Sequence, residues 1–196
     1  MHALSDDFDT EQEDIVKIIK AKERVTETFG KKKFSWNKFN GDLVCRVVKQ
    51  FLKRHLPTKM KVVGPNVYID GYPAEFDLML VTESAIPAAF TNAYRDSEVQ
   101  FVIEVKSHGN VAPDYPEELL SRFRNLREQY PNVNCTYLII REAWNPEKDN
   151  SPSYVKQLKR ALEPQFRVFS LAESRTHGII PGQWREFVSY LATTQT

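Results

Sequence analysis

This chain of 196 residues has few cysteines and only scattered histidines, which limits the kinds of site it can form. Cys45 and Cys135 stand alone rather than in a Cys-x-x-Cys pair, so the sequence indicates neither a disulfide framework nor a thiolate metal site. The four histidines are too widely spaced to suggest zinc ligands: His2, His55, His108 and His177. We therefore expect reduced thiols and no structural metal.

Long apolar runs are also missing, and none approaches the roughly 20 residues needed to cross a bilayer. The N-terminal stretch MHALSDDFD lacks the basic and apolar regions of a secretory signal. A phosphate-binding Gly-x-x-x-x-Gly-Lys-Ser/Thr loop is absent as well, so no ATP should be required by this chain. With 41% hydrophobic and 27% charged residues, the composition is that of an ordinary globular protein. From the missing apolar run and signal we expect a cytoplasmic protein without a membrane partner.

Net charge is only +1, which excludes a strongly basic nucleic-acid-binding protein, but the charge is unevenly distributed. Residues 1–14 contain six acids and no Lys or Arg, whereas residues 15–61 contain fourteen Lys and Arg against three acids. The second segment is a candidate phosphate-facing surface. Its lysines could equally solvate a helix and a loop, and the sequence leaves both interpretations open.

Apolar spacing predicts two helices in the first third of the chain. The first covers residues 11–29 and ends before Gly30, and we expect it outside the core. The second covers residues 41–56 and ends before Pro57. The sequence thus predicts two parts, an acidic lead-in with an added helix over 1–30 and one α/β domain over 31–196.

Strand-forming residues then alternate with helical patterns. Residues 62–69 and 75–81 flank Asp70-Gly71, a dipeptide favoured in tight turns, and predict a β-hairpin followed by a loop with a short helix over 82–97. The remaining expected elements are a strand at 99–106, a helix at 116–130, a strand at 135–141, a helix at 152–162, a strand at 166–171 and a helix at 182–191. A strand, a helix and a strand in succession imply a parallel crossover, so the sheet should be mixed.

The strand over residues 100–106 has two unlike faces. Side chains alternate along a strand, so Glu104 and Lys106 share one face while Phe101, Ile103 and Val105 share the other. An acid and a lysine at the end of an apolar strand are costly to desolvate unless each is paired or bound. We therefore expect one face to belong to the core and the other to a site.

Asp77 is a second charged residue within an apolar run, residues 74–80 of the hairpin. If neighbouring strands bring Asp77 close to Glu104, their repulsion must be relieved by protonation or by a divalent cation. Mg²⁺ suits two carboxylates and retains water ligands for substrate and nucleophile.

These residues resemble the PD-(D/E)xK phosphodiesterase superfamily, the fold of restriction endonucleases. The match consists of Asp77, a long spacer and Glu104-Val105-Lys106, which is the only Asp/Glu-x-Lys triplet in the chain. The predicted element order reproduces that family's αβββαβ core over about residues 41–141, with a mixed central sheet flanked by helices. Phe76 stands where the name-giving pattern has Pro, and Asp42 stands where many members have a Glu on the first helix.

The resemblance implies a Mg²⁺-dependent nuclease, with Mn²⁺ as a substitute, that hydrolyses phosphodiester bonds as an endonuclease on DNA. It assigns the metal to Asp77, Glu104 and the carbonyl of Val105, and it makes Lys106 the residue that positions the attacking water. Asp42 would be a further catalytic acid, or else a cap or first-turn acid favoured by the helix dipole. Many relatives dimerise, which makes a homodimer compatible with the resemblance.

Several other polar residues are candidate nucleic-acid contacts. Lys49, Lys53 and Arg54 lie on the polar face of the second helix, and Ser107 and His108 follow the triplet at the mouth of the expected site. Arg122, Arg124 and Arg127 on the next helix are of the type that contacts phosphates, although a solvent-facing helix surface commonly carries such charges.

Two alternatives remain open from the sequence. The first is a catalytically inert nucleic-acid-binding or scaffold module with the same fold, which would bind without metal-dependent turnover. The second is an unrelated α/β protein whose acids are structural, in which removal of Asp77 would destabilise the fold.

Overall fold

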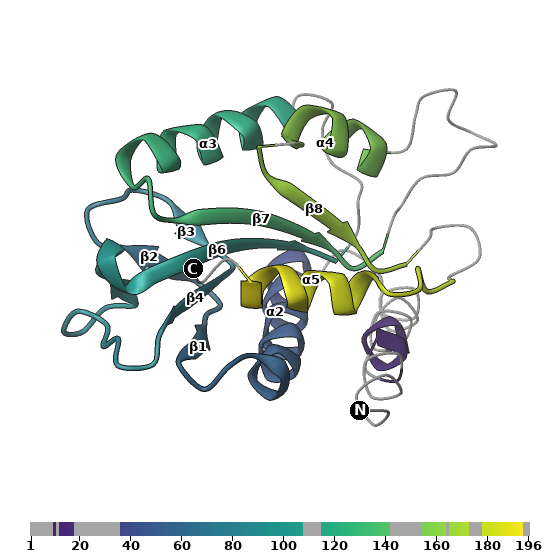
Figure 1. Ribbon diagram of the computed structural model, residues 1–196, viewed down its shortest axis with the longest axis horizontal. Coiled ribbons are helices and arrows are strands. Elements are labelled where there is room, and N and C mark those ends of the chain that lie inside the picture. The colour runs from purple at the N-terminus through teal and green to yellow at the C-terminus, as the bar shows by residue number, and fades with distance from the viewer. Residues whose placement is uncertain are drawn as a thin grey trace.

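A five-stranded mixed sheet forms the centre of the protein in the computed structural model, which describes residues 10, 12–17, 36–107, 115–141, 154–163, 165–172 and 178–193 (Figure 1). Its strand order is β1-β4-β6-β7-β8. The bounds are β1 Met60–Val63, β4 Leu78–Thr82, β6 Val99–Lys106, β7 Asn134–Ile139 and β8 Arg167–Ser170. Buried positions dominate in all five strands, which agrees with their apolar sequences.

The sheet is antiparallel on one side and parallel on the other. β4 pairs antiparallel with both β1 and β6, whereas β6, β7 and β8 are parallel to one another. The parallel connections pass through helices α3 (Tyr115–Gln129) and α4 (Tyr154–Leu162). The predicted fold class, an α/β domain with an αβββαβ core and a mixed central sheet flanked by helices, is confirmed.

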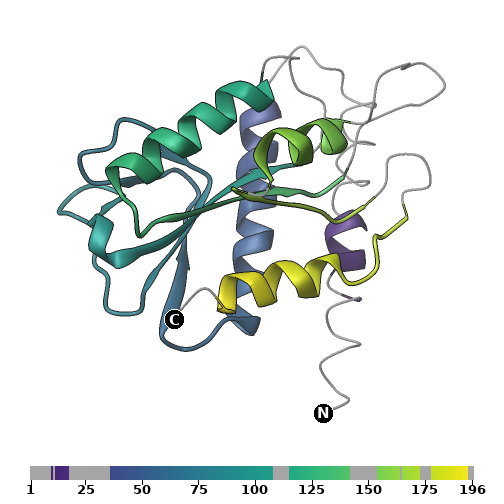
Figure 2. The same cartoon turned by 45° about the horizontal axis from the view of Figure 1, so that its top comes forward.

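Helices cover both faces of this sheet (Figure 2). On one face, α2 (Trp36–His55) and α5 (Gln183–Thr193) pack against Leu78, Phe101 and Ile103. On the other face, α3 and α4 pack against Met79, Val102 and Tyr137. The alternation of side chains along β4 and β6 sorts the residues into these two clusters, as period-2 geometry requires.

The predicted hairpin is divided between two sheets. Around the Asp70-Gly71 turn, β2 (Val67–Ile69) pairs with β3 (Glu75–Phe76), and β5 (Ala93–Tyr94) completes a separate three-stranded sheet. The outer parts of the hairpin, β1 and β4, belong to the central sheet instead. The chain changes sheets at Gly64 and at Asp77, which lie against each other. A Cβ atom on Gly64 would lie only 2.4 Å from the Asp77 carbonyl oxygen.

Two helix predictions are corrected. α2 begins at Trp36 rather than near Gly41, so its first turn contains no acid. Residues 12–17 are helical, but they pack against the core rather than outside it: Ile15 is buried in the α2 and α5 cluster, and the Gln12 side chain donates to the Leu171 carbonyl at 2.6 Å. The other residues of the predicted 11–29 helix lie outside the described part.

Most other predicted elements differ from the observed ones by one or two residues at their ends. Within residues 82–97, the expected short helix is a 3₁₀ turn at Asp96–Glu98, and β5 was not predicted. None of the described helices is both long and apolar enough to span a membrane.

Candidate active site

Asp77 and Glu104 face each other across two neighbouring strands. Leu78 of β4 pairs with Ile103 of β6, and the next pair in this antiparallel register is Asp77 with Glu104. Asp77 is also on the face of Met79, and Glu104 on the face of Val102, so the two carboxylates share the α3 side of the sheet. Lys106 follows two positions after Glu104 on the same face.

Asp77 lies between β3 and β4, and its side chain accepts a main-chain hydrogen bond from β6 in place of a backbone partner. The backbone N–H of Val105 donates to Asp77 Oδ2 at 2.8 Å. Because the N–H and C=O of a strand residue point to the same side, the Val105 carbonyl is also directed toward this edge. The site therefore offers a main-chain oxygen beside the two carboxylates.

Two cations hold the Glu104 carboxylate. Lys106 Nζ lies 2.7 Å from Oε1, and an Arg122 guanidinium nitrogen from α3 donates to Oε2. The same Lys106 ammonium lies 3.9 Å from Asp77 Oδ2. Glu104 is only 6% exposed, so these charge-assisted bonds replace the water that it gave up on folding.

The two acids respond to this environment in opposite directions. Burial, reinforced by the negative charge of Glu104, raises the pKa of Asp77 from 3.8 to about 6, although Lys106 opposes the change. Burial also acts to raise the pKa of Glu104, but the nearby Lys106 and Arg122 charges outweigh burial and lower it. In the absence of a metal ion, a proton entering the pair therefore goes to Asp77.

The donor set fits a hard divalent cation. Asp77, Glu104 and the Val105 carbonyl are all oxygen donors, and a cation would offset both causes that raise the Asp77 pKa, burial first and then the charge of Glu104. Within the described residues there is no group of three or more His, Cys, Asp or Glu side chains that could hold a metal. A cation here would take its remaining ligands from water and substrate, as Mg²⁺ commonly does.

Asp42 lies on α2 near this site. Cys45, one turn further along α2, is 1% exposed. Burial is the main cause that raises the pKa of the Cys45 thiol, and the negative charge of Asp77 raises it further. Asp42 and Glu104 also raise this pKa, more weakly, whereas the positive charge of Lys106 lowers it. All four charged groups are thus within electrostatic reach of one thiol. Since α2 begins at Trp36, Asp42 is not a first-turn acid, which removes that interpretation of it.

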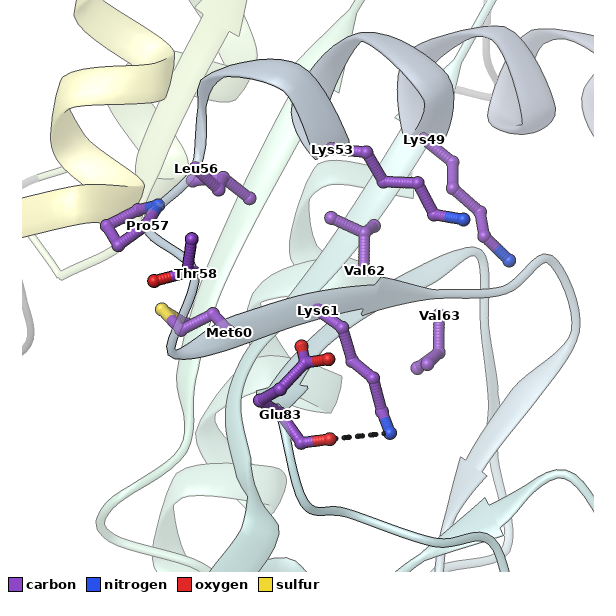
Figure 3. Close-up of a pocket in the computed structure, with 10 residues that line it drawn as sticks. All are labelled: Lys49, Lys53, Leu56, Pro57, Thr58, Met60, Lys61, Val62, Val63 and Glu83. Carbon is purple, nitrogen blue, oxygen red and sulfur yellow. Dashed lines mark hydrogen bonds between the residues drawn. The ribbon is translucent and has the colours of Figure 1, made fainter.

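The predicted nucleic-acid contacts on α2 lie in two different places. Lys49 and Lys53 project into a groove of about 620 Å³ between α2 and β1, together with Lys61 (Figure 3). Lys49 Nζ donates to the Gly64 carbonyl at 2.7 Å, and burial, helped by Lys53 and Arg46, lowers its pKa. Arg54 instead lies over the Phe51 ring, with its guanidinium carbon 5.5 Å from the ring centroid.

The residues after the triplet are only partly described. Ser107 directly follows β6 and is half-buried. His108 lies outside the described residues.

Arg122 is the site residue whose place the sequence analysis missed. It was grouped with Arg124 and Arg127 as a surface charge, yet it bonds Glu104. A signal was present, because Leu119, Arg122, Phe123 and Leu126 follow the i, i+3, i+4, i+7 spacing of the apolar stripe. An arginine on a core-facing stripe indicates an internal partner.

Comparisons with known proteins identify the fold. No protein-family model matches the chain, and no curated protein matches it. Among solved structures, the cAAA-bound form of NucC from P. aeruginosa ATCC27853 aligns with 100% of this chain and 93% of its own, at 13% identity and a TM-score of 0.65. The cAAA-bound form of NucC from E. coli MS115-1 aligns with 84% and 72%, at 15% identity and a TM-score of 0.56. The chain therefore shares its mixed α/β fold with NucC.

Proposed function

We propose that this protein is a metal-dependent nuclease that hydrolyses phosphodiester bonds, acting as an endonuclease on DNA. The observation that carries the proposal is the pair of facing carboxylates, Asp77 and Glu104, with the Lys106 ammonium within 4 Å of both. A carboxyl group that is held beside a second carboxylate and has a raised pKa is typical of a functional site.

Each residue has a role that follows from its position. Asp77, Glu104 and the Val105 carbonyl would hold Mg²⁺ or Mn²⁺, which when bound lowers the pKa of a ligand water and offsets charge on the phosphate. Lys106, fixed by its bond to Glu104, positions and polarises the attacking water. Asp42 supplies a further carboxylate from α2.

Basic residues beside the site would hold the substrate. Lys49, Lys53 and Arg54 of α2 are proposed to bind DNA phosphates, and Ser107 and His108 to contact the strand at the mouth of the site. Such contacts release counterions, so binding should weaken steeply with added salt. We further propose that the protein acts in the cytoplasm as a homodimer, in which two sites would cut two strands.

The test is cleavage of labelled duplex, nicked, branched and single-stranded DNA with Mg²⁺, Mn²⁺ or EDTA. Asp77→Asn and Lys106→Ala should lose nearly all turnover, while Lys106→Ala should still bind metal. Arg185→Gln on α5, which removes an exposed cation elsewhere, is the control and should cut normally. Undiminished cutting by Lys106→Ala would refute its role. DNA binding without cutting by the wild type would favour the inert module.

A second candidate function is suggested by the groove in Figure 3. Three lysines line it, against one acid, Glu83, and Lys53 has no bonding partner among the described residues. Such a groove suits a phosphate-bearing ligand. Because both NucC structures named above carry cAAA, that compound is the first to test. Lys53→Gln should lose cAAA binding if the groove is a ligand site, and should weaken DNA binding instead if it is a substrate surface.

A further inference from the structure

Every anionic oxygen of Glu104 is occupied by a side-chain cation. Lys106 bonds Oε1 and Arg122 bonds Oε2, while the Glu104 side chain is only 7% exposed. A metal ion that takes Glu104 as a ligand must share an oxygen with one of these two cations or displace it, and in either case the two compete for the same negative charge. The question is which one leaves.

The charges of the site favour displacement. Asp77 and Glu104 contribute two negative charges, and Lys106 and Arg122 contribute two positive charges within the same cluster. A cluster with no net charge gives a divalent cation little long-range attraction, and a guanidinium beside the ligand repels it. Metal binding therefore becomes favourable when one positive group moves away.

Arg122 is the group placed to move. Lys106 lies between both acids and is fixed to the same strand as Glu104, whereas Arg122 reaches the site from α3. While it bonds Glu104, the guanidinium carbon of Arg122 already lies 6.0 Å and 5.9 Å from the ring centroids of Phe76 and Phe123, so these rings can retain it when that bond breaks. Its backbone is held separately, because the Tyr72 hydroxyl donates to the Arg122 carbonyl at 3.4 Å. A rotation of the side chain alone is enough.

We propose that Arg122 competes with the divalent cation for Glu104, and that metal binding releases its guanidinium to the substrate phosphate. A planar guanidinium binds phosphate oxygens through two parallel hydrogen bonds, which a lysine cannot do. The metal-free site is thus closed by its own arginine, and the same arginine becomes a phosphate contact once the metal is in place. This inference rests on the proposed nuclease function for its substrate and on the geometry alone for the competition.

Metal affinity tests the competition without any cleavage. In calorimetric titration with Mn²⁺ and no DNA, Arg122→Gln should bind at least about tenfold more tightly than the wild type, because the competing cation is gone. Arg124→Gln is the matched control: Arg124 lies on the same helix, but its side chain bonds Gln165, so its removal should leave the affinity unchanged. Unchanged or weaker Mn²⁺ binding by Arg122→Gln would overturn the proposal.

A measurement on the unaltered chain covers the case in which Arg122→Gln does not fold. The arginine Nε resonance that disappears in Arg122→Lys should shift when Mg²⁺ is added to the wild type, and a resonance that stays in place would refute the release. At saturating metal, Arg122→Gln should cut DNA at least about tenfold more slowly although it binds metal better. If the wild type cuts no DNA, the proposed function fails, yet the Mn²⁺ titration still decides the competition.

Discussion

Replacing Asp77 with the neutral Asn should stabilise the metal-free protein, although it should abolish the proposed activity. The Asp77 pKa is about 6 in the folded chain against an ordinary 3.8, chiefly because of burial and then because of Glu104. Folding therefore favours the protonated acid, and keeping Asp77 ionised at pH 7 costs stability. A difference of about two pKa units corresponds to about 3 kcal/mol. Asn retains an oxygen that can accept the Val105 N–H.

The pH dependence follows from the sign of that change. Below 3.8, Asp77 is protonated in both states and costs nothing. The cost grows as pH rises from 3.8 to about 6 and is complete above it. The stability gain from Asp77→Asn should therefore fall from about 3 kcal/mol at pH 7 to about 1 kcal/mol at pH 4.5.

Urea unfolding in EDTA at the two pH values measures this gain. Asp96→Asn, which alters an exposed acid, should change stability by no more than about 0.5 kcal/mol at either pH. Divalent metal at about 100 times its dissociation constant should add about 2.7 kcal/mol to the wild type and much less to Asp77→Asn. A variant no more stable than wild type at pH 7 without metal, or a gain independent of pH, would refute the reasoning.

Three further results are expected. Gly64→Ala should lower the free energy of unfolding in urea by more than about 2 kcal/mol, because its Cβ would lie 2.4 Å from the Asp77 carbonyl oxygen at a φ of +120°. In the control Gly182→Ala the new Cβ meets no atom within 4 Å, so the loss should be only about 1 kcal/mol. The buried Cys45 thiol, whose pKa is raised, should react with a disulfide reagent at pH 8 only when the protein unfolds; rapid labelling of the native chain would contradict this. Phe90→Gly should leave stability equal or higher, since it removes about 1–2 kcal/mol of strain at a φ of +63° against about 0.5–1 kcal/mol of added chain entropy, and a clear loss would show that the exposed ring makes a stabilising contact.

The elements that the sequence predicted well are those whose signal is local. The apolar stripe of α2 and the alternation in β6 depend on helix and strand periodicity, which a short window of residues contains. The shared face of Glu104 and Lys106 is of this kind. The start of α2 was missed because residues 36–40 contain two asparagines and aromatic residues, which favour a helix only weakly.

Contacts between distant segments were harder to predict. The hairpin was divided because Gly64 approaches the Asp77 backbone, a packing that no local pattern contains. β5 pairs through two residues and has too little sequence to give a strand signal. The role of Arg122 depends on how α3 lies across β6, which the apolar stripe indicates only in direction.

The sequence by itself determined the α/β class, the mixed sheet and the triplet Glu104-Val105-Lys106, because periodicity and side-chain alternation are fixed by local backbone geometry. Only the tertiary structure decided that Asp77 faces Glu104, that Lys106 lies within reach of both, and that Arg122 occupies the remaining carboxylate oxygen. The physical reason is that these distances depend on strand register and helix placement. Both are set by packing between segments far apart in the chain.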